Sequence, residues 1–257
     1  MEEITEQFRK LDPESSENLQ QVEEIIGYSF RNKGLLEEAY TDPSYTKNPK
    51  SSYERLEFLG DTVLNFLMGT ELFSLYPDLM PGELTQLRSA NVSTEKLARA
   101  AAEHGLYRFL RHDKPLLSAQ IEEFVSTFSR YSLSCVGLID APKTLANIVE
   151  STIGAVFVDC NNSNEITSKV IKKLLQPIII PSTMTRHPVT LLFEICQKNG
   201  FHIEVIDSWQ ENGQIEIMIA NKYVGRGEYK TKKAIAYNRA AADAYNDIVE
   251  KHHVDDS

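Results

Sequence analysis

One segment, residues 53–76, constrains the fold more than any other part of the sequence. Its apolar residues recur at spacings of three and four, which is the period of an α-helix that buries one face or more. Pro77 and Pro81 follow it and end the helical pattern. The residues that set the period are Leu56, Leu59, Val63, Phe66, Leu67 and Met68. The chain must therefore build a helical core around this segment.

The same segment carries three carboxylates near its start. On a helix, Glu57 and Asp61 are four residues apart and share one face, and Glu54 lies one turn earlier. Stacked carboxylates repel each other unless they are solvated, paired with bases or bound to a cation. A solvated helix face is the ordinary alternative. Because the surrounding segment is strongly apolar and offers only Arg55 as a local base, we expect a site for a hard cation such as Mg²⁺.

A second predicted helix, residues 143–158, offers another oxygen-bearing pair. Asn147 and Glu150 stand three residues apart, among the apolar Ile148, Val149 and Ile153. The spacing of an EF-hand loop is absent, which disfavours a structural Ca²⁺ site. Oxygen ligands that converge from two helices are typical of metal-assisted phosphoryl chemistry.

The sequence divides into three parts. An acidic flexible tail is predicted for residues 1–21, a helical domain for 22–180, and a small α+β module for 187–252, after prolines interrupt the helical pattern. In the module, Asn212-Gly213 lies in the predicted turn between the first two strands. The predicted elements of the module are a helix (189–199), three strands (202–206, 214–219 and 222–227) and a helix (232–249).

Charge at first argues against a nucleic-acid partner. The formal net charge is −10, with a pI near 5.2. However, residues 1–30 alone hold eight acids and two bases, whereas residues 222–239 hold six bases and one acid. The total therefore permits a local surface for phosphates, although we expect duplex binding to be modest and steeply salt-sensitive.

Several classes of protein are excluded more simply. The three cysteines are far apart and form neither a zinc pattern nor a disulfide framework. No apolar run reaches the roughly 18 residues of a membrane-spanning helix. The N-terminal residues lack the apolar core of a secretory signal, so we expect a location in the nucleus and/or the cytoplasm.

Five motifs carry a family resemblance. They are ERLEFLGD followed by VL (54–61 and 63–64), GYSF (27–30), TDPSY (41–45), PGEL (81–84) and LANIVESTIGAVFVD (145–159). Together they resemble the ribonuclease III family, and the C-terminal module is similar to the double-stranded-RNA-binding domain of that family. Within the family, the chain resembles the plant ribonuclease-three-like proteins. The resemblance implies a mainly α fold: an all-helical endonuclease domain followed by an α-β-β-β-α double-stranded-RNA-binding domain.

The resemblance also implies roles for particular residues. Glu54, Glu57, Asp61 and Glu150 match the catalytic acids, and the implied metal ligands are Glu57, Asp61, Asn147 and Glu150. The family has Asp where this chain has Asn147. The amide oxygen can still ligate Mg²⁺, but it brings no charge, so we expect a weakened enzyme whose cleavage Asn147→Asp would raise. A catalytically inactive relative that binds structured RNA or acts as a scaffold is the alternative.

Phe58 and the C-terminal module are implied to make contacts with partners. Phe58 matches the aromatic residue that enters a partner subunit in the homodimer; ordinary core packing is the alternative. The module departs from the family pattern, because Ala234 and Tyr237 stand where bases are usual and the hairpin lacks a Gly-Pro-x-His motif. A dimerisation module is therefore the alternative to RNA binding. The predicted RNA-binding residues are Glu194 and Lys198, which match a minor-groove contact of the family, and Lys230, Lys232 and Lys233 of the basic run at 222–239.

The function implied by the resemblance is cleavage of double-stranded RNA by a homodimeric, Mg²⁺-dependent endoribonuclease. A metal-activated water would attack the phosphodiester and leave 5′-phosphate and 3′-hydroxyl ends with short 3′ overhangs. We expect Mn²⁺ to substitute for Mg²⁺, and we expect no organic cofactor and no membrane partner. A metal-dependent phosphohydrolase of small molecules is a further alternative.

Overall fold

The computed structural model describes residues 16–46, 51–131 and 137–255, which form two compact units. The first, here the helical unit, comprises Met1–Ser129 and Ala141–Met184; the second, here the α/β unit, comprises Arg130–Asp140 and Thr185–Ser257. Within the described ranges, no helix combines the length and the apolar character that crossing a membrane requires.

The described elements of the helical unit are all helices, as predicted. Proline at the first position of α5 and α7, and Ser93 and Ser163 as caps of α6 and α9, mark where helices begin. In chain order the helices are α2 (Ser16–Ile26), α3 (Lys33–Ala39), α4 (Glu54–Leu75), α5 (Pro81–Asn91), α6 (Thr94–Glu103), η2 (Leu106–Phe109), α7 (Pro115–Thr127), η3 (Phe128–Arg130), α8 (Lys143–Asp159) and α9 (Asn164–Leu175).

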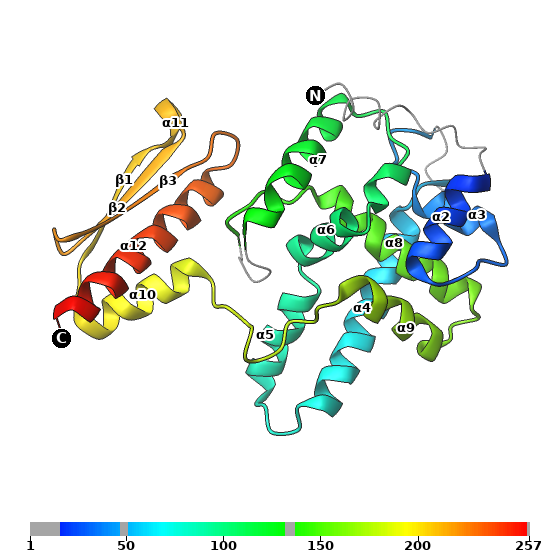
Figure 1. The fold of residues 1–257 in the computed structure, drawn as a ribbon, viewed down its shortest axis with the longest axis horizontal. Helices are drawn as coiled ribbons and strands as arrows, with labels where there is room; N and C mark the ends of the chain where they lie inside the picture. Colours follow the sequence, from blue (N-terminus) through cyan, green and yellow to red (C-terminus); the bar gives the residue numbers. More distant parts are fainter. Residues whose placement is uncertain (1–15, 47–50, 132–136, 256–257) are drawn as a thin grey trace. The chain divides into compact units, whose positions relative to one another are not determined.

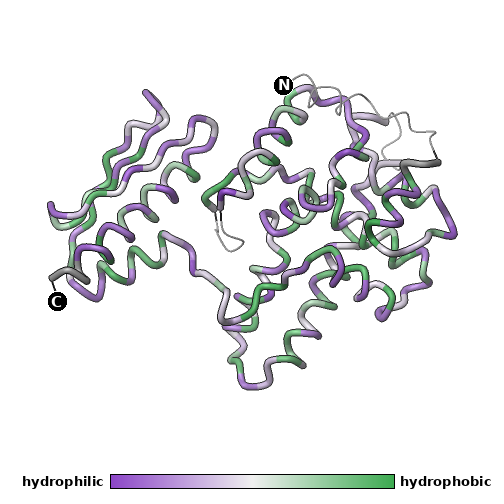
Figure 2. Tube along the Cα trace, in the orientation of Figure 1, coloured by the Kyte–Doolittle hydropathy of each residue, from purple (hydrophilic) through white to green (hydrophobic). Residues whose placement is uncertain are grey.

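The centre of the helical unit is a close approach of α4 and α8 (Figure 1). Glycine makes this approach possible on both helices. A β-carbon on Gly60 would come within 1.7 Å of the carbonyl oxygen of Glu150, and one on Gly154 within 2.2 Å of the carbonyl oxygen of Leu56. Both helices are rich in apolar residues along their length (Figure 2), and nearly every residue of α8 from Leu145 to Val156 is buried.

The C-terminal end of α8 anchors the connection between α2 and α3. Asp159 accepts hydrogen bonds from the Tyr28 hydroxyl (2.7 Å) and from the backbone N–H groups of Arg31 (2.9 Å) and Asn32 (2.8 Å). Burial raises the pKa of Asp159, but the backbone hydrogen bonds from Arg31 and Asn32 outweigh it and leave this pKa below its usual value. The carboxylate therefore stays ionised and ties the N-terminal helices to the core.

The chain that follows α9 is fastened to the helical unit by two buried polar side chains. Asn91 donates to the carbonyl of Ile179 and accepts from its N–H, each at 2.8 Å, as a neighbouring strand would. The buried Lys96 donates to the carbonyl of Pro177 at 2.8 Å. These contacts satisfy backbone groups that would otherwise be unpaired away from water.

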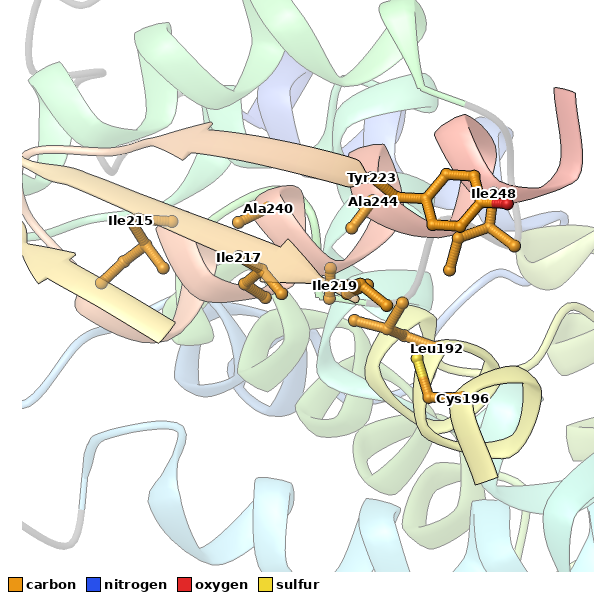
Figure 3. Close-up of a cluster of buried hydrophobic side chains, with 11 residues drawn as sticks. Leu192, Cys196, Ile215, Ile217, Ile219, Tyr223, Ala240, Ala244 and Ile248 are labelled. Carbon is orange, nitrogen blue, oxygen red and sulfur yellow. The ribbon is translucent and has the colours of Figure 1, made fainter. Parts of the chain in front are cut away.

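The α/β unit has the predicted α-β-β-β-α order, with antiparallel strands in the spatial order β1-β2-β3. The central strand alternates: Ile215, Ile217 and Ile219 are buried and pack with residues of α10 and α12 (Figure 3). The elements are α10 (Pro188–Asn199), β1 (Ile203–Ser208), α11 (Trp209–Asn212), β2 (Gln214–Ile219), β3 (Tyr223–Glu228) and α12 (Lys233–Asp255).

Small residues bring β3 against α12. A β-carbon on Gly225 would lie 2.2 Å from the carbonyl oxygen of Ala240, and one on Gly227 would lie 2.0 Å from that of Ala236. The glycines of β3 and the alanines of α12 therefore form complementary surfaces. This close packing explains why the module has both a glycine-containing strand and an alanine-rich helix.

Two sequence predictions differ from the structure in detail. Asn212-Gly213 does not join the strands directly: the one-turn helix α11 intervenes, and Gly213 ends it with a positive φ of 80°. The Trp209 indole N–H donates to the carbonyl of Tyr229 at 2.7 Å, which holds this turn against the chain that follows β3. At the N-terminus, α2 begins at Ser16, inside the predicted flexible tail of 1–21; residues 1–15 lie outside the described ranges.

The α/β unit also includes a segment from the middle of the predicted helical domain, Arg130–Asp140. Side chains of α12 satisfy its backbone: Asn238 donates to the carbonyl of Gly137 and Arg239 to that of Leu138, each at 2.9 Å. These carbonyls come from a weakly patterned stretch of sequence, so neither periodicity nor composition predicts the contact.

We predict that Gly154→Ala lowers the free energy of unfolding by about 2–4 kcal/mol, because the new methyl group must displace the backbone of α4. Gly69→Ala is the matched control, since the nearest neighbour to its β-carbon would be Arg88 at 3.8 Å. That substitution should raise stability by about 0.5–1 kcal/mol through helix propensity. Urea unfolding measures both; equal effects would contradict the close approach of α4 and α8.

Candidate active site

The approach of α4 and α8 brings the predicted acids of both helices together. Gly60 lies against the backbone of Glu150, so its neighbours Glu57 and Asp61 must lie across from α8 at the level of Glu150 and Asn147. The carboxylates of Glu57 and Glu150 are half-buried, whereas those of Glu54 and Asp61 are exposed. The predicted catalytic acids therefore share one region of the helical unit.

Two of the four acids, Glu150 and Glu57, have raised pKa values. Burial, together with the negative charges of Asp61 and Glu57, raises the pKa of Glu150 to about 7 against the opposing charge of Lys143. Burial also raises the pKa of Glu57, with Glu54 and Asp61 acting in the same direction and Lys143 against it. The site is thus an electronegative region in which the charged forms lack sufficient compensation.

Asn147 is buried and only partly satisfied. Its side chain is 9% exposed, and its Nδ2 donates to the Tyr53 hydroxyl at 3.4 Å. Among the buried side-chain nitrogen and oxygen atoms of the described residues, Oδ1 of Asn147 alone has no hydrogen-bond partner. A buried acceptor without a partner costs free energy, so it is a feature that a ligand would relieve.

Tyr53 connects Asn147 to a buried carboxylate. The Tyr53 hydroxyl donates to Oδ2 of Asp42 at 3.0 Å, and Lys114 forms an ion pair with the same oxygen at 2.9 Å. Oδ1 of Asp42 accepts from the backbone N–H of Ser44 at 2.8 Å. Burial raises the pKa of Asp42, but hydrogen bonds from Ser44 and Lys114 outweigh it and lower this pKa below its usual value. The Asp42 carboxyl group therefore favours its ionised form, which only accepts hydrogen bonds.

Sequence reasoning missed four residues around the acids. Lys143 was detectable, because it stands four residues before Asn147 and seven before Glu150, on the same face of α8. Three others, Asp42, Tyr53 and Lys114, come from separate segments of the chain, and no sequence spacing predicts that they are in contact. They matter because they surround the one neutral member of the predicted ligand set.

The predicted ligands suit a hard divalent cation in chemical type. Three carboxylates and an amide oxygen are the donors that Mg²⁺ prefers, and the amide oxygen of Asn147 is the one left without a partner. Across the described ranges, however, no three His, Cys, Asp or Glu side chains converge closely enough to hold a metal ion. Asp61 instead accepts a hydrogen bond from Asn65 at 2.8 Å, and Glu54 one from Ser52 at 3.3 Å.

The predicted RNA-binding residues are exposed, and several have partners within the α/β unit. Glu194 forms two hydrogen bonds of 2.5 Å with Arg186. Lys232 pairs with Asp140 at 3.0 Å, and Lys233 pairs with Asp207. Lys198, in the last turn of α10, and Lys230, before α12, are also exposed. The structure thus gathers Lys230, Lys232 and Lys233 at the start of α12, with carboxylates beside two of them.

Phe58 does not belong to the core of this chain. Its side chain is 77% exposed, and Phe66 (58%) and Phe73 (71%) are also exposed on α4. Their spacings of eight and seven residues keep the three rings within one broad face of the helix. An apolar helix face of this kind is unusual on the surface of a soluble monomer.

Comparison with known proteins identifies the family of the chain. A family model described as ribonuclease III domain matches residues 54–161. Ribonuclease 3-like protein 3 of Oryza sativa subsp. japonica is 47% identical over 232 residues, 89% of this chain and 78% of that protein. Endoribonuclease Dicer homolog 1 of Arabidopsis thaliana is 40% identical over 237 residues, 90% of this chain but 12% of that protein.

Among solved structures, the nuclease domain of ribonuclease III from Campylobacter jejuni is 27% identical, with a TM-score of 0.46. It aligns over 62% of this chain and 99% of that chain. The sequence matches confirm the predicted family and enzyme class. The chain belongs to the ribonuclease III family of endoribonucleases.

Proposed function

We propose that the protein is a Mg²⁺-dependent endoribonuclease that cleaves double-stranded RNA, with Mn²⁺ as a substitute. The observation that carries the proposal is the group of mutually repelling acids on α4 and α8 beside a buried, unpartnered amide oxygen. Repulsion among acids and an unmet acceptor both disfavour the site as it stands, and a hard cation relieves both. The residues that would hold it are Glu57, Asp61, Asn147 and Glu150.

When bound, Mg²⁺ supplies a nucleophilic water at neutral pH and neutralises the leaving oxygen, which would give 5′-phosphate and 3′-hydroxyl ends with short 3′ overhangs. The chain's own residues set the conditions for this chemistry. The acids supply oxygen donors from two rigid helices, and Lys143 places a positive charge among them that a phosphate of the RNA backbone can meet. Because Asn147 is neutral, the site has three formal charges from its four ligands, which supports a weak rather than a fully efficient enzyme.

A second candidate function rests on the same asparagine. A relative without activity that binds structured RNA, or serves as a scaffold, would need no fourth charge at the site. The neutral side chain at position 147 is the observation that favours this candidate. The raised pKa values of Glu150 and Glu57 favour the enzyme, because carboxyl groups perturbed by burial and like charges are typical of functional sites.

We propose that the start of α12 contacts the phosphates of duplex RNA. Lys230, Lys232 and Lys233 lie at a helix N-terminus, where backbone N–H groups add to their charge. Asp140 and Asp207 compete with phosphates for two of these lysines, which supports modest affinity.

We propose further that the protein is a homodimer joined through the apolar face of α4. Phe58, Phe66 and Phe73 offer large exposed rings on a single rigid helix, and this helix also carries Glu57 and Asp61. An interface on α4 would therefore place the active sites of both subunits next to the subunit boundary, which suits cleavage of both strands of one duplex.

Glu150→Gln should reduce cleavage of long duplex RNA by about 100-fold or more, because it removes one of three ligand charges at the site. The wild type should cut with Mg²⁺ and not with EDTA, and end-labelling should reveal 5′-phosphates. Glu165→Gln is the control, since Glu165 is exposed and pairs with Lys169 on α9. A wild type that stays inert at high Mg²⁺ and high Mn²⁺ would rule out the nuclease proposal and leave the inactive relative.

Asp140→Asn should tighten binding to duplex RNA about two- to fivefold at low salt, because a surface ion pair worth about 0.2–1 kcal/mol no longer competes for Lys232. Affinity is measured in EDTA so that the RNA stays intact. Glu250→Gln removes the same charge from the exposed surface near the other end of α12 and controls for net charge. Equal gains from both substitutions would argue against a specific surface at the start of α12.

Phe58→Glu should convert the dimer into a monomer, because it places a charge in an apolar interface. Light scattering coupled to gel filtration measures the mass directly. Phe193→Glu, a substitution of a 49%-exposed phenylalanine in the α/β unit, should leave the mass unchanged. A monomeric wild type at tens of micromolar concentration would contradict an interface on α4.

A further inference from the structure

At Tyr53, the ionised state of Asp42 fixes which group donates and which accepts in each hydrogen bond. Asp42 is an ionised carboxylate and can only accept, so the single hydroxyl proton of Tyr53 must point to Oδ2 of Asp42. The Tyr53 oxygen then has only lone pairs to offer its other neighbours. Nδ2 of Asn147 donates to one of these lone pairs at 3.4 Å. Tyr53 thus has no proton left for residue 147.

This arrangement decides which atom of Asn147 remains free. The amide must turn its nitrogen to Tyr53, because an oxygen there would meet lone pairs and no proton. Oδ1 is consequently the atom without a partner, as observed. The choice depends on Asp42, which lies 105 positions away in the sequence and is completely buried.

We propose that Asp42 and Tyr53 are positioning residues that make residue 147 a hydrogen-bond donor toward the core and present its carbonyl oxygen as a neutral ligand in the acid site. The part of this inference that concerns a ligand rests on the proposed function. The structural part does not rest on it. While Asp42 holds the Tyr53 proton, a carboxylate at position 147 neither donates a hydrogen bond to the Tyr53 oxygen nor receives one from it.

The proposal changes the expectation for Asn147→Asp. A side chain with a fourth charge matches the family, yet here it would face the Tyr53 oxygen and add a buried acceptor without a donor. Asp42→Asn should relieve the conflict. Its amide nitrogen donates to Tyr53, which frees the hydroxyl proton for the new carboxylate at position 147. Lys114 then loses its ion-pair partner, but its side chain is 48% exposed and can turn to water.

The test measures the thermal midpoint of the full chain for Asn147→Asp in three backgrounds. In the wild-type background we expect a loss of about 3–8 °C, the size of one unmet buried hydrogen-bonding group in a chain of this length. In the Asp42→Asn background the hydroxyl proton of Tyr53 can turn to position 147, and in the Tyr53→Phe background Asn147 has already lost its acceptor, so in both the loss should fall below half of that value. Asn164→Asp, at an exposed position in the first turn of α9, adds the same charge and should change the midpoint equally in all three backgrounds.

An equal loss in all three backgrounds would overturn the proposal. If Asn147→Asp does not fold, recovery of a folded protein in either double variant supports it, and failure in both overturns it. Cleavage of duplex RNA is measured on the same proteins, and the double variant of Asp42→Asn with Asn147→Asp should cut faster than Asn147→Asp alone. If the midpoints behave as expected but every variant and the wild type are inert, the proposed function fails while the positioning role stands. If the proteins cut RNA but the loss in midpoint is the same in all three backgrounds, the positioning role is refuted and the proposed function stands.

Discussion

The contact on which the structure depends most is the approach of the α4 and α8 backbones at Gly60 and Gly154. No other residue fits there, because any β-carbon would occupy the space of a carbonyl oxygen. The contact buries α8 almost completely and places Glu57 and Asp61 across from Glu150. Packing and chemistry therefore share one origin: the glycines that let the helices touch also set the distance between the acids.

The α/β unit uses the same principle for a different purpose. Gly225 and Gly227 let β3 lie on α12, so the sheet and the helix form a thin two-layer core with little room for larger side chains. The N-terminal start of α12 remains exposed and basic, but carboxylates of the same unit already pair with two of its lysines. The α/β unit thus has a closely packed core, and its own carboxylates partly neutralise its basic surface.

The sequence predicted those parts of the structure that depend on local period. The helices at 54–75 and 143–159 and the three strands follow from spacings of three, four and two residues, and the acids on the two helices follow from the same count. The turn between β1 and β2 does contain Asn212-Gly213, but the helical turn of α11 before it, where the Trp209 indole donates to Tyr229, was not predicted.

What the sequence did not predict depends on residues that meet only after folding. Asp42, Tyr53, Lys114 and Asn147 are brought together from four segments, and the direction of their hydrogen bonds follows from which of them is ionised. The pairing of Lys232 with Asp140 likewise joins a helix to a stretch with no clear pattern. No count of spacings contains this information, although the residue types were visible from the start.

The placement of Arg130–Asp140 in the α/β unit has a consequence for how the protein can be divided. The chain passes from one unit to the other three times rather than once, so the two units are not consecutive modules. A fragment that stops at Met184 keeps Asp140 and loses Lys232, and a fragment that begins at Thr185 keeps Arg239 and loses the carbonyl of Leu138. A division at residue 184 therefore breaks the contacts that α12 makes with residues 137–140.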